Sequence, residues 1–148
     1  LYQSHRPYVE QPEFKEALRF KGDIAVIHLG INDTDPRNWP NYRDEFVKDY
    51  LSIMDSLRAA NPKVRFILAR MTPIADRHPR FQSGTKQWHD EIQTAIETVA
   101  RVSGAELIDF HEPLYPYPNL LPDAIHPNPE GAGILAKTVY GGITGNYG

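Results

Sequence analysis

Three short apolar runs that alternate with longer segments of helical period constrain the fold of this chain most strongly. The runs are rich in β-branched residues and read DIAVIHL (23–29), VRFILARM (64–71) and AELIDF (105–110). Short, almost continuous apolar runs are typical of strands buried on both faces of a parallel sheet. We therefore expect three parallel strands from these segments.

The segments around these runs have the apolar spacing and the end signals of helices. A proline in the first turn, a glycine just past the end or an Asn-Pro pair marks most of their limits. The helices are expected from Pro12 to the closing Gly22, over 42–60, over 86–102 with Gly104 after it, and from the cap Asn128 to about Tyr140. This αβαβαβα order predicts an α/β fold of three layers, α/β/α, with a parallel sheet and helices on both faces.

Composition limits the domain number and the classes of partner. A chain of 148 residues with 41% apolar and 24% charged residues fits one domain. We assign residues 1–140 to that domain and 141–148 to the start of a linker or tail. The 16 Lys and Arg residues are scattered among 19 Asp and Glu residues, so no nucleic-acid partner is expected. The sequence contains no cysteine, which excludes disulfides, thiolate metal sites and cysteine nucleophiles, and its apolar runs are too short to span a membrane.

Polar residues that could carry chemistry follow the predicted strands. The carboxyl ends of parallel strands form one edge of a sheet, where ligands bind. In the loop after the third strand, Asp123 can orient one ring nitrogen of His126 and leave the other as a base. After the first strand, Asn32 offers an amide that can stabilise an oxyanion, and Gly30 lets the backbone approach a ligand. We therefore predict a site for proton transfer at this edge.

Two further residues are candidates for contact with substrate. Trp39, with Tyr115 and Tyr117, can stack on a sugar ring or pack beneath a long loop. Arg70, at the end of the second strand, can bind an acidic group of the substrate or a nearby protein carboxylate. Both alternatives stay open for each residue.

Histidines and serines outside the Asp123–His126 pair have ordinary structural explanations. His28 is expected within or near the core, and the spacing of His78, His89 and His111 does not converge on a metal. Among the serines, Ser83 lies on a loop at the predicted edge, whereas Ser4 lies near the start; Ser52, Ser56 and Ser103 are expected on helix surfaces or at helix ends. None of them is a strong candidate for a nucleophile.

The motif GIND (30–33) and the Asp-x-x-His of DAIH (123–126) resemble the third and fifth conserved blocks of the SGNH, or GDSL-type, esterase family. The segment FKGDIAVIHLGINDTDPRNW (20–39) resembles the sialate O-acetylesterase-like branch of that family. The resemblance implies a flavodoxin-like sheet with strand order 2-1-3-4-5, of which this chain supplies strands three to five. It also implies that the block with the catalytic serine lies upstream, so that this chain is the C-terminal part of the domain.

By this resemblance the chain belongs to an esterase that removes small acyl groups, most plausibly O-acetyl, from carbohydrates. The serine attacks the ester, His126 moves its proton, Asp123 orients the ring, and Asn32 with Gly30 holds the oxyanion. No metal or organic cofactor is implied, and related esterases suggest a secreted or periplasmic location. The alternatives are an inert sugar-binding or interaction fragment and an acyltransferase.

The first predicted strand also suggests a protein partner. The run at 23–29 has the pattern of an internal strand, and on its own it would expose an apolar, unpaired edge. An upstream segment or a companion chain that completes the sheet is therefore expected.

Overall fold

The computed structural model describes residues 7–79 and 85–148 and contains a three-stranded parallel sheet in the order β1-β2-β3. The strands are β1 (Ile24–Ile27), β2 (Arg65–Arg70) and β3 (Glu106–Asp109). Ala25 of β1 pairs with Phe66, and Leu68 pairs with Leu107 of β3. Each strand lies within the predicted apolar run, so the three strands and their parallel arrangement are confirmed.

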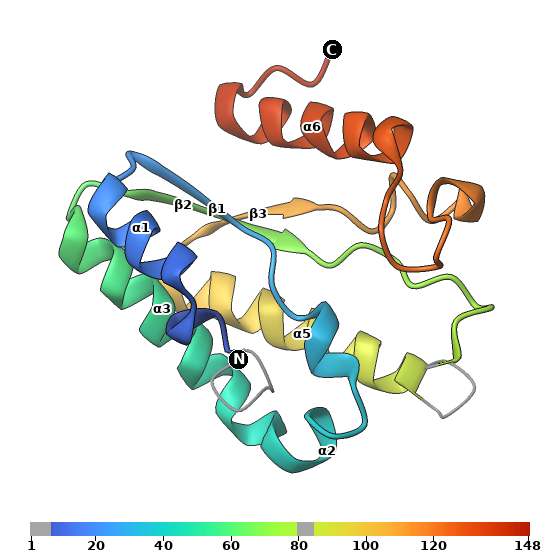
Figure 1. Cartoon of the computed structure of the whole chain (residues 1–148). Helices are drawn as coiled ribbons and strands as arrows, with labels where there is room; N and C mark the ends of the chain where they lie inside the picture. Colours follow the sequence, from blue (N-terminus) through green and yellow to red (C-terminus); the bar gives the residue numbers. More distant parts are fainter. Residues whose placement is uncertain (1–6, 80–84) are drawn as a thin grey trace.

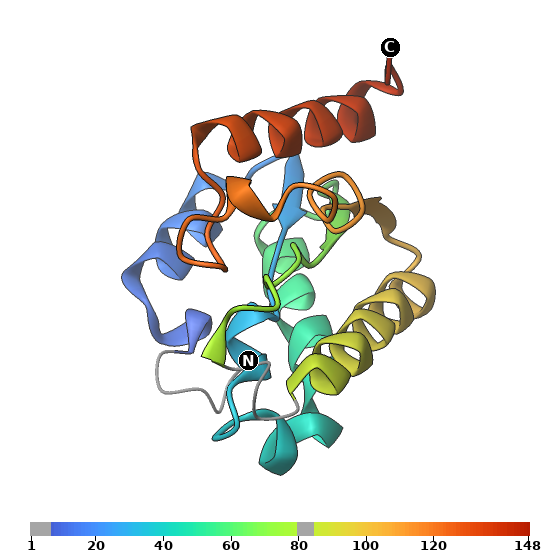
Figure 2. The same ribbon diagram turned by 90° about the vertical axis from the view of Figure 1, so that its right-hand side faces the viewer.

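Helices cover both faces of the sheet, as predicted (Figure 1). On one side lie α1 (Pro12–Phe20), α3 (Phe46–Ala60) and α5 (Thr85–Ser103), whereas α6 (Pro129–Thr144) lies alone on the other. Figure 2 shows the same separation from another side, with α6 above the strands and α5 below them. The fold is therefore the three-layer α/β/α class.

Shorter turns of helix join these elements. They are α2 (Trp39–Tyr42) and the 3₁₀ turns η1 (Tyr8–Glu10), η2 (Ile31–Thr34), η3 (Arg43–Glu45) and η4 (Pro118–Leu120). No helix among residues 7–79 and 85–148 is long and apolar enough to cross a membrane.

The central strand β2 is buried on both faces because its side chains alternate between two apolar layers. Phe66 and Leu68 point into the larger layer, which packs against α3 and α5. Ile67 and Ala69 point into the smaller layer, where they meet apolar residues of β3 and α6. Because its side chains alternate in this way, β2 packs against helices on both faces of the sheet.

Three helix limits differ from the sequence predictions. The single helix expected over 42–60 is broken: the backbone leaves helical geometry at Tyr42, and α3 begins only at Phe46. Helix α1 ends at Phe20, and the residue after it, Lys21, adopts the left-handed conformation (φ 52°) expected of Gly22. Helix α6 passes Tyr140 because Gly142 lets it approach the sheet; a Cβ at Gly142 would lie 2.7 Å from Ile108 Cγ2.

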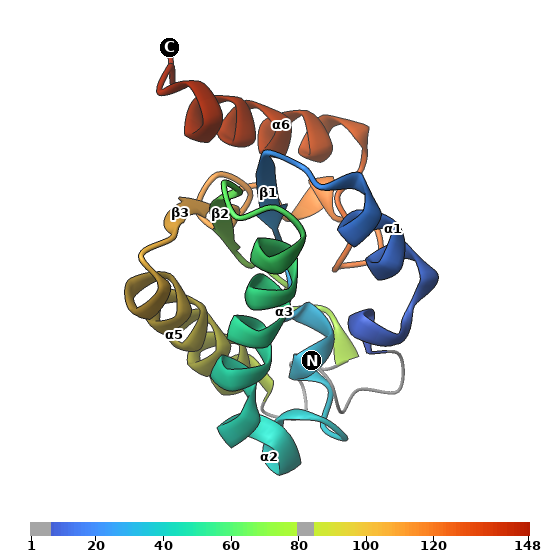
Figure 3. The same cartoon turned by 90° about the vertical axis from the view of Figure 1, so that its left-hand side faces the viewer.

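The outer edge of β1 pairs with no strand in the part of the chain that the structure describes. Ile24 and Val26 are 40% and 37% exposed, and beside them lies a groove of about 670 Å³ between β1, α1 and α3. Figure 3 shows α1 set to the side of β1. The expected open apolar edge is therefore present.

Candidate active site

Asp123 and His126 form a hydrogen-bonded pair in the loop between η4 and α6. His126 Nδ1 lies 2.5 Å from Asp123 Oδ2, while Asp123 Oδ1 accepts the backbone N–H groups of His126 (2.6 Å) and Ile125 (2.9 Å). The backbone N–H and ring of His126, then the N–H of Ile125, hold the pKa of Asp123 well below its usual range. An ionised Asp123 therefore fixes the His126 ring, and Nε2 remains as the basic nitrogen.

The loop that carries this pair is closed by backbone contacts at its end. Asn128 N–H donates to Leu120 C=O at 2.8 Å, and the Asn128 side chain caps α6 by accepting from Gly131 N–H at 2.9 Å. Ala124, between the two catalytic candidates, has a positive φ of 71°. The loop is thus a defined turn joined to the start of α6.

Gly30 and Asn32 follow β1 at the same edge of the sheet. Gly30 has a φ of 127°, and a Cβ there would lie 2.8 Å from Met71 Sδ and 3.0 Å from Ile92 Cγ2. Close packing therefore requires glycine at this position, whether or not a ligand also approaches it. Asn32 is exposed, and its side-chain amide makes no hydrogen bond to a residue that the structure describes.

His28 also lies near this edge. Its Nε2 accepts the Thr72 backbone N–H at 3.3 Å, and its ring packs edge-on against Phe110 at 5.1 Å. Burial lowers the pKa of His28. His28 therefore lies where the sequence placed it, within or near the core.

Of the two alternatives left open for Trp39, the structure shows packing. Its side chain is 5% exposed, the indole N–H donates to Glu91 at 2.7 Å, and the ring packs edge-on against Phe46 at 5.6 Å. The exposed aromatic residues near the sheet edge are instead Tyr115 and Tyr117. Trp39 therefore packs in the core, which was the alternative for this residue.

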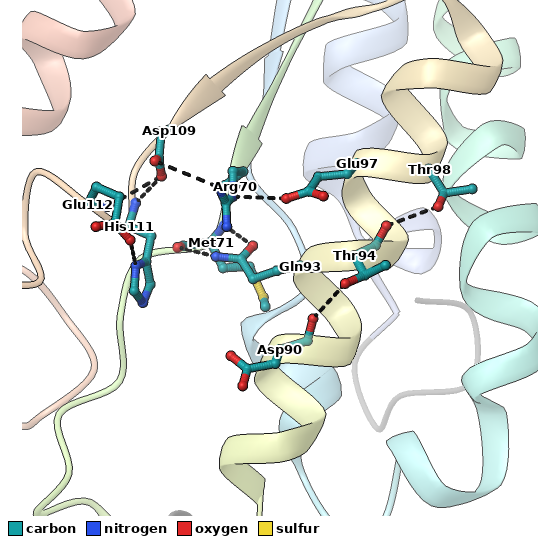
Figure 4. A network of polar contacts seen from close by, with 10 residues as sticks. All are labelled: Arg70, Met71, Asp90, Gln93, Thr94, Glu97, Thr98, Asp109, His111 and Glu112. Atoms are coloured by element: carbon teal, nitrogen blue, oxygen red, sulfur yellow. Dashed lines mark hydrogen bonds and ion pairs between the residues drawn. The ribbon is translucent and has the colours of Figure 1, made fainter.

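Arg70 faces protein carboxylates (Figure 4). Its Nε lies 3.4 Å from Glu97 and its Nη1 lies 3.9 Å from Asp109. It lines a polar cleft of about 310 Å³ together with His89, His111 and other polar residues. Two carboxylates therefore lie near the Arg70 guanidinium, but its buried Nε makes no hydrogen bond within the described residues. A contact with an acidic group of the substrate stays a prediction.

Two buried polar residues of α5 were not recognised as candidates from the sequence. His89 Nε2 donates to Thr72 C=O at 3.0 Å, and Gln93 bonds both backbone groups of Met71. The two side chains are 3% and 5% exposed. Their spacing of i and i+4 on the apolar face of a helix was the available signal, since polar residues there need partners.

The serines that the structure describes show no activated nucleophile. Ser56 donates to Ser52 C=O on α3, and Ser103 bonds the backbone at the end of α5. Ser4 and Ser83 lie outside the described residues. Within 7–79 and 85–148, no group of three or more His, Asp or Glu side chains is arranged to hold a metal ion.

A family match covers most of the chain. Residues 3–134 match the GDSL-like lipase/acylhydrolase family. The chain belongs to this family. The GDSL-like family consists of carboxylic ester hydrolases, and the two GDSL-type motifs named from the sequence carry Asn32 and the Asp123–His126 pair at one sheet edge.

A curated relative of this GDSL-like chain is an acetylxylan esterase of Xylanibacter ruminicola. It is 34% identical over 154 residues, which cover 93% of this chain and 32% of the relative. This chain therefore spans about a third of the relative's length.

Solved structures of several esterases share the fold. They include a GDSL-like lipase from Bacteroides thetaiotaomicron (TM-score 0.65, 21% identity, 88% of this chain and 69% of that one). A carbohydrate esterase of family 3 from Talaromyces cellulolyticus gives a TM-score of 0.65 at 21% identity, over 88% and 62% of the two chains. An acetylxylan esterase from Geobacillus stearothermophilus gives 0.62 at 22%, over 88% and 63%. At these identities the similarity shows the fold, and it confirms the predicted class.

Proposed function

We propose that this chain supplies the base and an oxyanion donor of a serine esterase that hydrolyses small acyl esters, chiefly O-acetyl esters, of carbohydrates. The hydrogen bond between Asp123 and His126 at the ligand-binding edge of a GDSL-family fold carries this proposal. A carboxylate that fixes the ring of a neutral histidine is the arrangement that serine acyl transfer needs.

In the proposed reaction, His126 Nε2 takes the proton of a serine hydroxyl as the serine oxygen bonds to the acyl carbon. The carbonyl oxygen becomes an oxyanion, to which the Asn32 amide donates a hydrogen bond. The C–O bond to the sugar then breaks, and His126 returns the proton to the sugar oxygen. Water, activated by the same nitrogen, releases the acid and restores the serine.

The serine is proposed to come from a segment upstream of this chain or from a companion chain. The open edge of β1 supports this, because a further parallel strand there would cover Ile24 and Val26. The end of such a strand would lie beside the end of β1, from which Gly30 and Asn32 follow. A secreted or periplasmic location is proposed because related carbohydrate esterases are commonly secreted or periplasmic.

The substrate class is proposed from two similarities. The curated relative is an acetylxylan esterase, and residues 20–39 resemble sialate O-acetylesterase-like proteins. Both substrates are acetyl esters of carbohydrate hydroxyl groups. Acetylated xylan and O-acetylated sialic acid are therefore the two substrates to compare.

A fluorophosphonate, which forms a stable adduct with an activated serine, tests this function by intact mass. We expect an adduct on the protein that includes the upstream segment and none on this chain alone. Acetate release by that protein should fall by about 10⁴-fold or more in His126→Ala and by about 10²- to 10³-fold in Asn32→Ala.

Three outcomes would contradict parts of the proposal. An adduct on Ser4 or Ser83 would place the nucleophile inside this chain. Absence of both adduct and acetate release from the longer protein would favour the inert sugar-binding fragment. Transfer of the acetyl group to added sugar instead of water would identify an acyltransferase.

A further inference from the structure

Met71 and Thr72 directly follow β2, and each of their backbone N–H and C=O groups is hydrogen-bonded to a side chain. Gln93 Oε1 accepts the Met71 N–H at 2.8 Å, and Gln93 Nε2 donates to the Met71 C=O at 3.0 Å (Figure 4). His28 accepts the Thr72 N–H at 3.3 Å, and His89 donates to the Thr72 C=O at 3.0 Å. Because Met71 is 0% and Thr72 2% exposed, water cannot replace these partners, and the segment is fixed at this point.

The chain beyond Thr72 then contacts the loop of the Asp123–His126 pair. Ala75 N–H donates to the C=O of Ala124 at 2.8 Å. Arg77 donates from Nη1 to Pro118 C=O at 3.3 Å and from Nη2 to Leu121 C=O. These bonds join the loop on both sides of Asp123.

From this geometry we propose that Arg77 is a positioning residue for the Asp123–His126 pair, acting from a segment anchored to α5 by Gln93 and His89. The kinetic consequence rests on the proposed esterase function, whereas the structural consequence does not. Arg77 acts through the loop, because its hydrogen bonds within the described residues go to backbone carbonyls and not to either catalytic candidate.

The effect of Arg77 on the pair follows from the turn that it holds. Leu121 C=O also accepts the Ala124 N–H at 2.9 Å, and Ala124 takes a left-handed conformation between Asp123 and His126. That conformation costs free energy, so surrounding contacts must maintain it. If the turn relaxes, Asp123 loses the N–H groups of Ile125 and His126 that now fix it.

Arginine suits this position because its planar fork can reach two carbonyls at once. Lysine has a single ammonium group and a flexible stem, so it cannot hold Pro118 and Leu121 in the same geometry. We therefore expect Arg77→Lys to restore only part of the function that Arg77→Ala removes.

The first test uses this chain and needs no catalytic activity. In Arg77→Ala, the pKa of Asp123, followed by ¹³C NMR of its carboxyl carbon, should rise toward its ordinary value of about 3.9. The His126 ring N–H signal should broaden by faster exchange, and Arg77→Lys should lie between. The matched control is Arg101→Ala, at the exposed C-terminal turn of α5 and the opposite end of the sheet, which should change neither signal.

The second test uses the protein that includes the upstream segment. Arg77→Ala should lower kcat for acetate release by about 10- to 100-fold, as small misplacements of catalytic groups do, with KM nearly unchanged. Urea midpoints measured alongside would show whether the fold is intact, and Arg77→Lys provides a folded variant if Arg77→Ala does not fold.

An unchanged Asp123 pKa and ring signal in both Arg77 variants would overturn the positioning role. So would a loss that Arg101→Ala reproduces, because the cause would then be general charge or stability. If the unmutated protein releases no acetate while the NMR changes occur, the esterase proposal fails and the positioning of the pair stands.

Discussion

Replacing Gln93 with leucine gives the sharpest stability prediction for this chain. The side chain is 5% exposed and makes two hydrogen bonds, at 2.8 and 3.0 Å, to the N–H and C=O of Met71. Leucine has a similar size but no polar atoms, so both backbone groups would be buried without a partner. Each such group costs about 1–3 kcal/mol.

The gain from burying an apolar side chain in place of an amide offsets part of this cost. We expect Gln93→Leu to lower the free energy of unfolding by about 2–4 kcal/mol. Urea unfolding followed by far-UV circular dichroism measures this value, and an unchanged m-value would show that the mutation acts on stability alone.

The matched control is Gln87→Leu on the same helix. Gln87 is exposed and bonds only Glu91 in the described structure, at 3.0 Å, so its replacement should change stability by less than about 0.5 kcal/mol. Gln93→Glu provides a second check, because a carboxylate accepts the Met71 N–H but cannot donate to its C=O. If Gln93→Leu is no more destabilising than Gln87→Leu, the stabilising role assigned to the two Gln93–Met71 hydrogen bonds is wrong.

Two further predictions concern Gly30 and His89. Gly30→Ala should destabilise the chain by about 1–3 kcal/mol, because its φ of 127° and the Cβ contact of 2.8 Å with Met71 Sδ exclude a side chain. Gly133→Ala on α6, where a Cβ meets nothing, should instead be neutral or stabilising by up to about 1 kcal/mol in urea unfolding. Burial lowers the pKa of His89, so the unfolded chain binds its proton at higher pH than the folded chain. Stability should therefore be full above about pH 6.5 and fall as the pH decreases below that value. His89→Gln keeps a donor for Thr72 without titrating, so its urea midpoint should fall less between about pH 7.5 and about pH 5.5; an equal fall would contradict this origin.

The strands could be predicted from the sequence because their signals are local. An apolar, β-branched run has few alternatives to a buried strand, and β2 is buried on both faces as its composition indicated. Gly104, with a φ of 73°, and Asn128, which caps α6, are also single-residue signals of backbone geometry. The edge that carries the candidate site then follows from parallel topology alone.

The hydrogen bond between Asp123 and His126 was predictable for a similar reason. The two residues are close in sequence, and Pro127 restricts the backbone of His126 to an extended form. Short loops leave few ways to separate such a pair.

Only the tertiary structure decided the roles of Trp39 and Gln93. Trp39 is in the core because Glu91, distant in sequence, accepts its indole N–H at 2.7 Å. Gln93 matters because Met71, 22 positions away in sequence, directly follows β2 and lies against the Gln93 helix. Periodicity identifies the buried face of an element but not the backbone groups that this face will meet.

The sequence by itself thus determined the class of sheet, its open first edge and the Asp-His pair, since each depends on residues near one another in the chain. Only the structure shows that Arg77 bonds the loop of that pair and that Gln93 and His89 of α5 bond the segment before Arg77. Those contacts join residues 17 to 44 positions apart, and their partners are backbone carbonyls and amides. Every residue has such groups, so no residue pattern in the sequence marks the ones that will be bound.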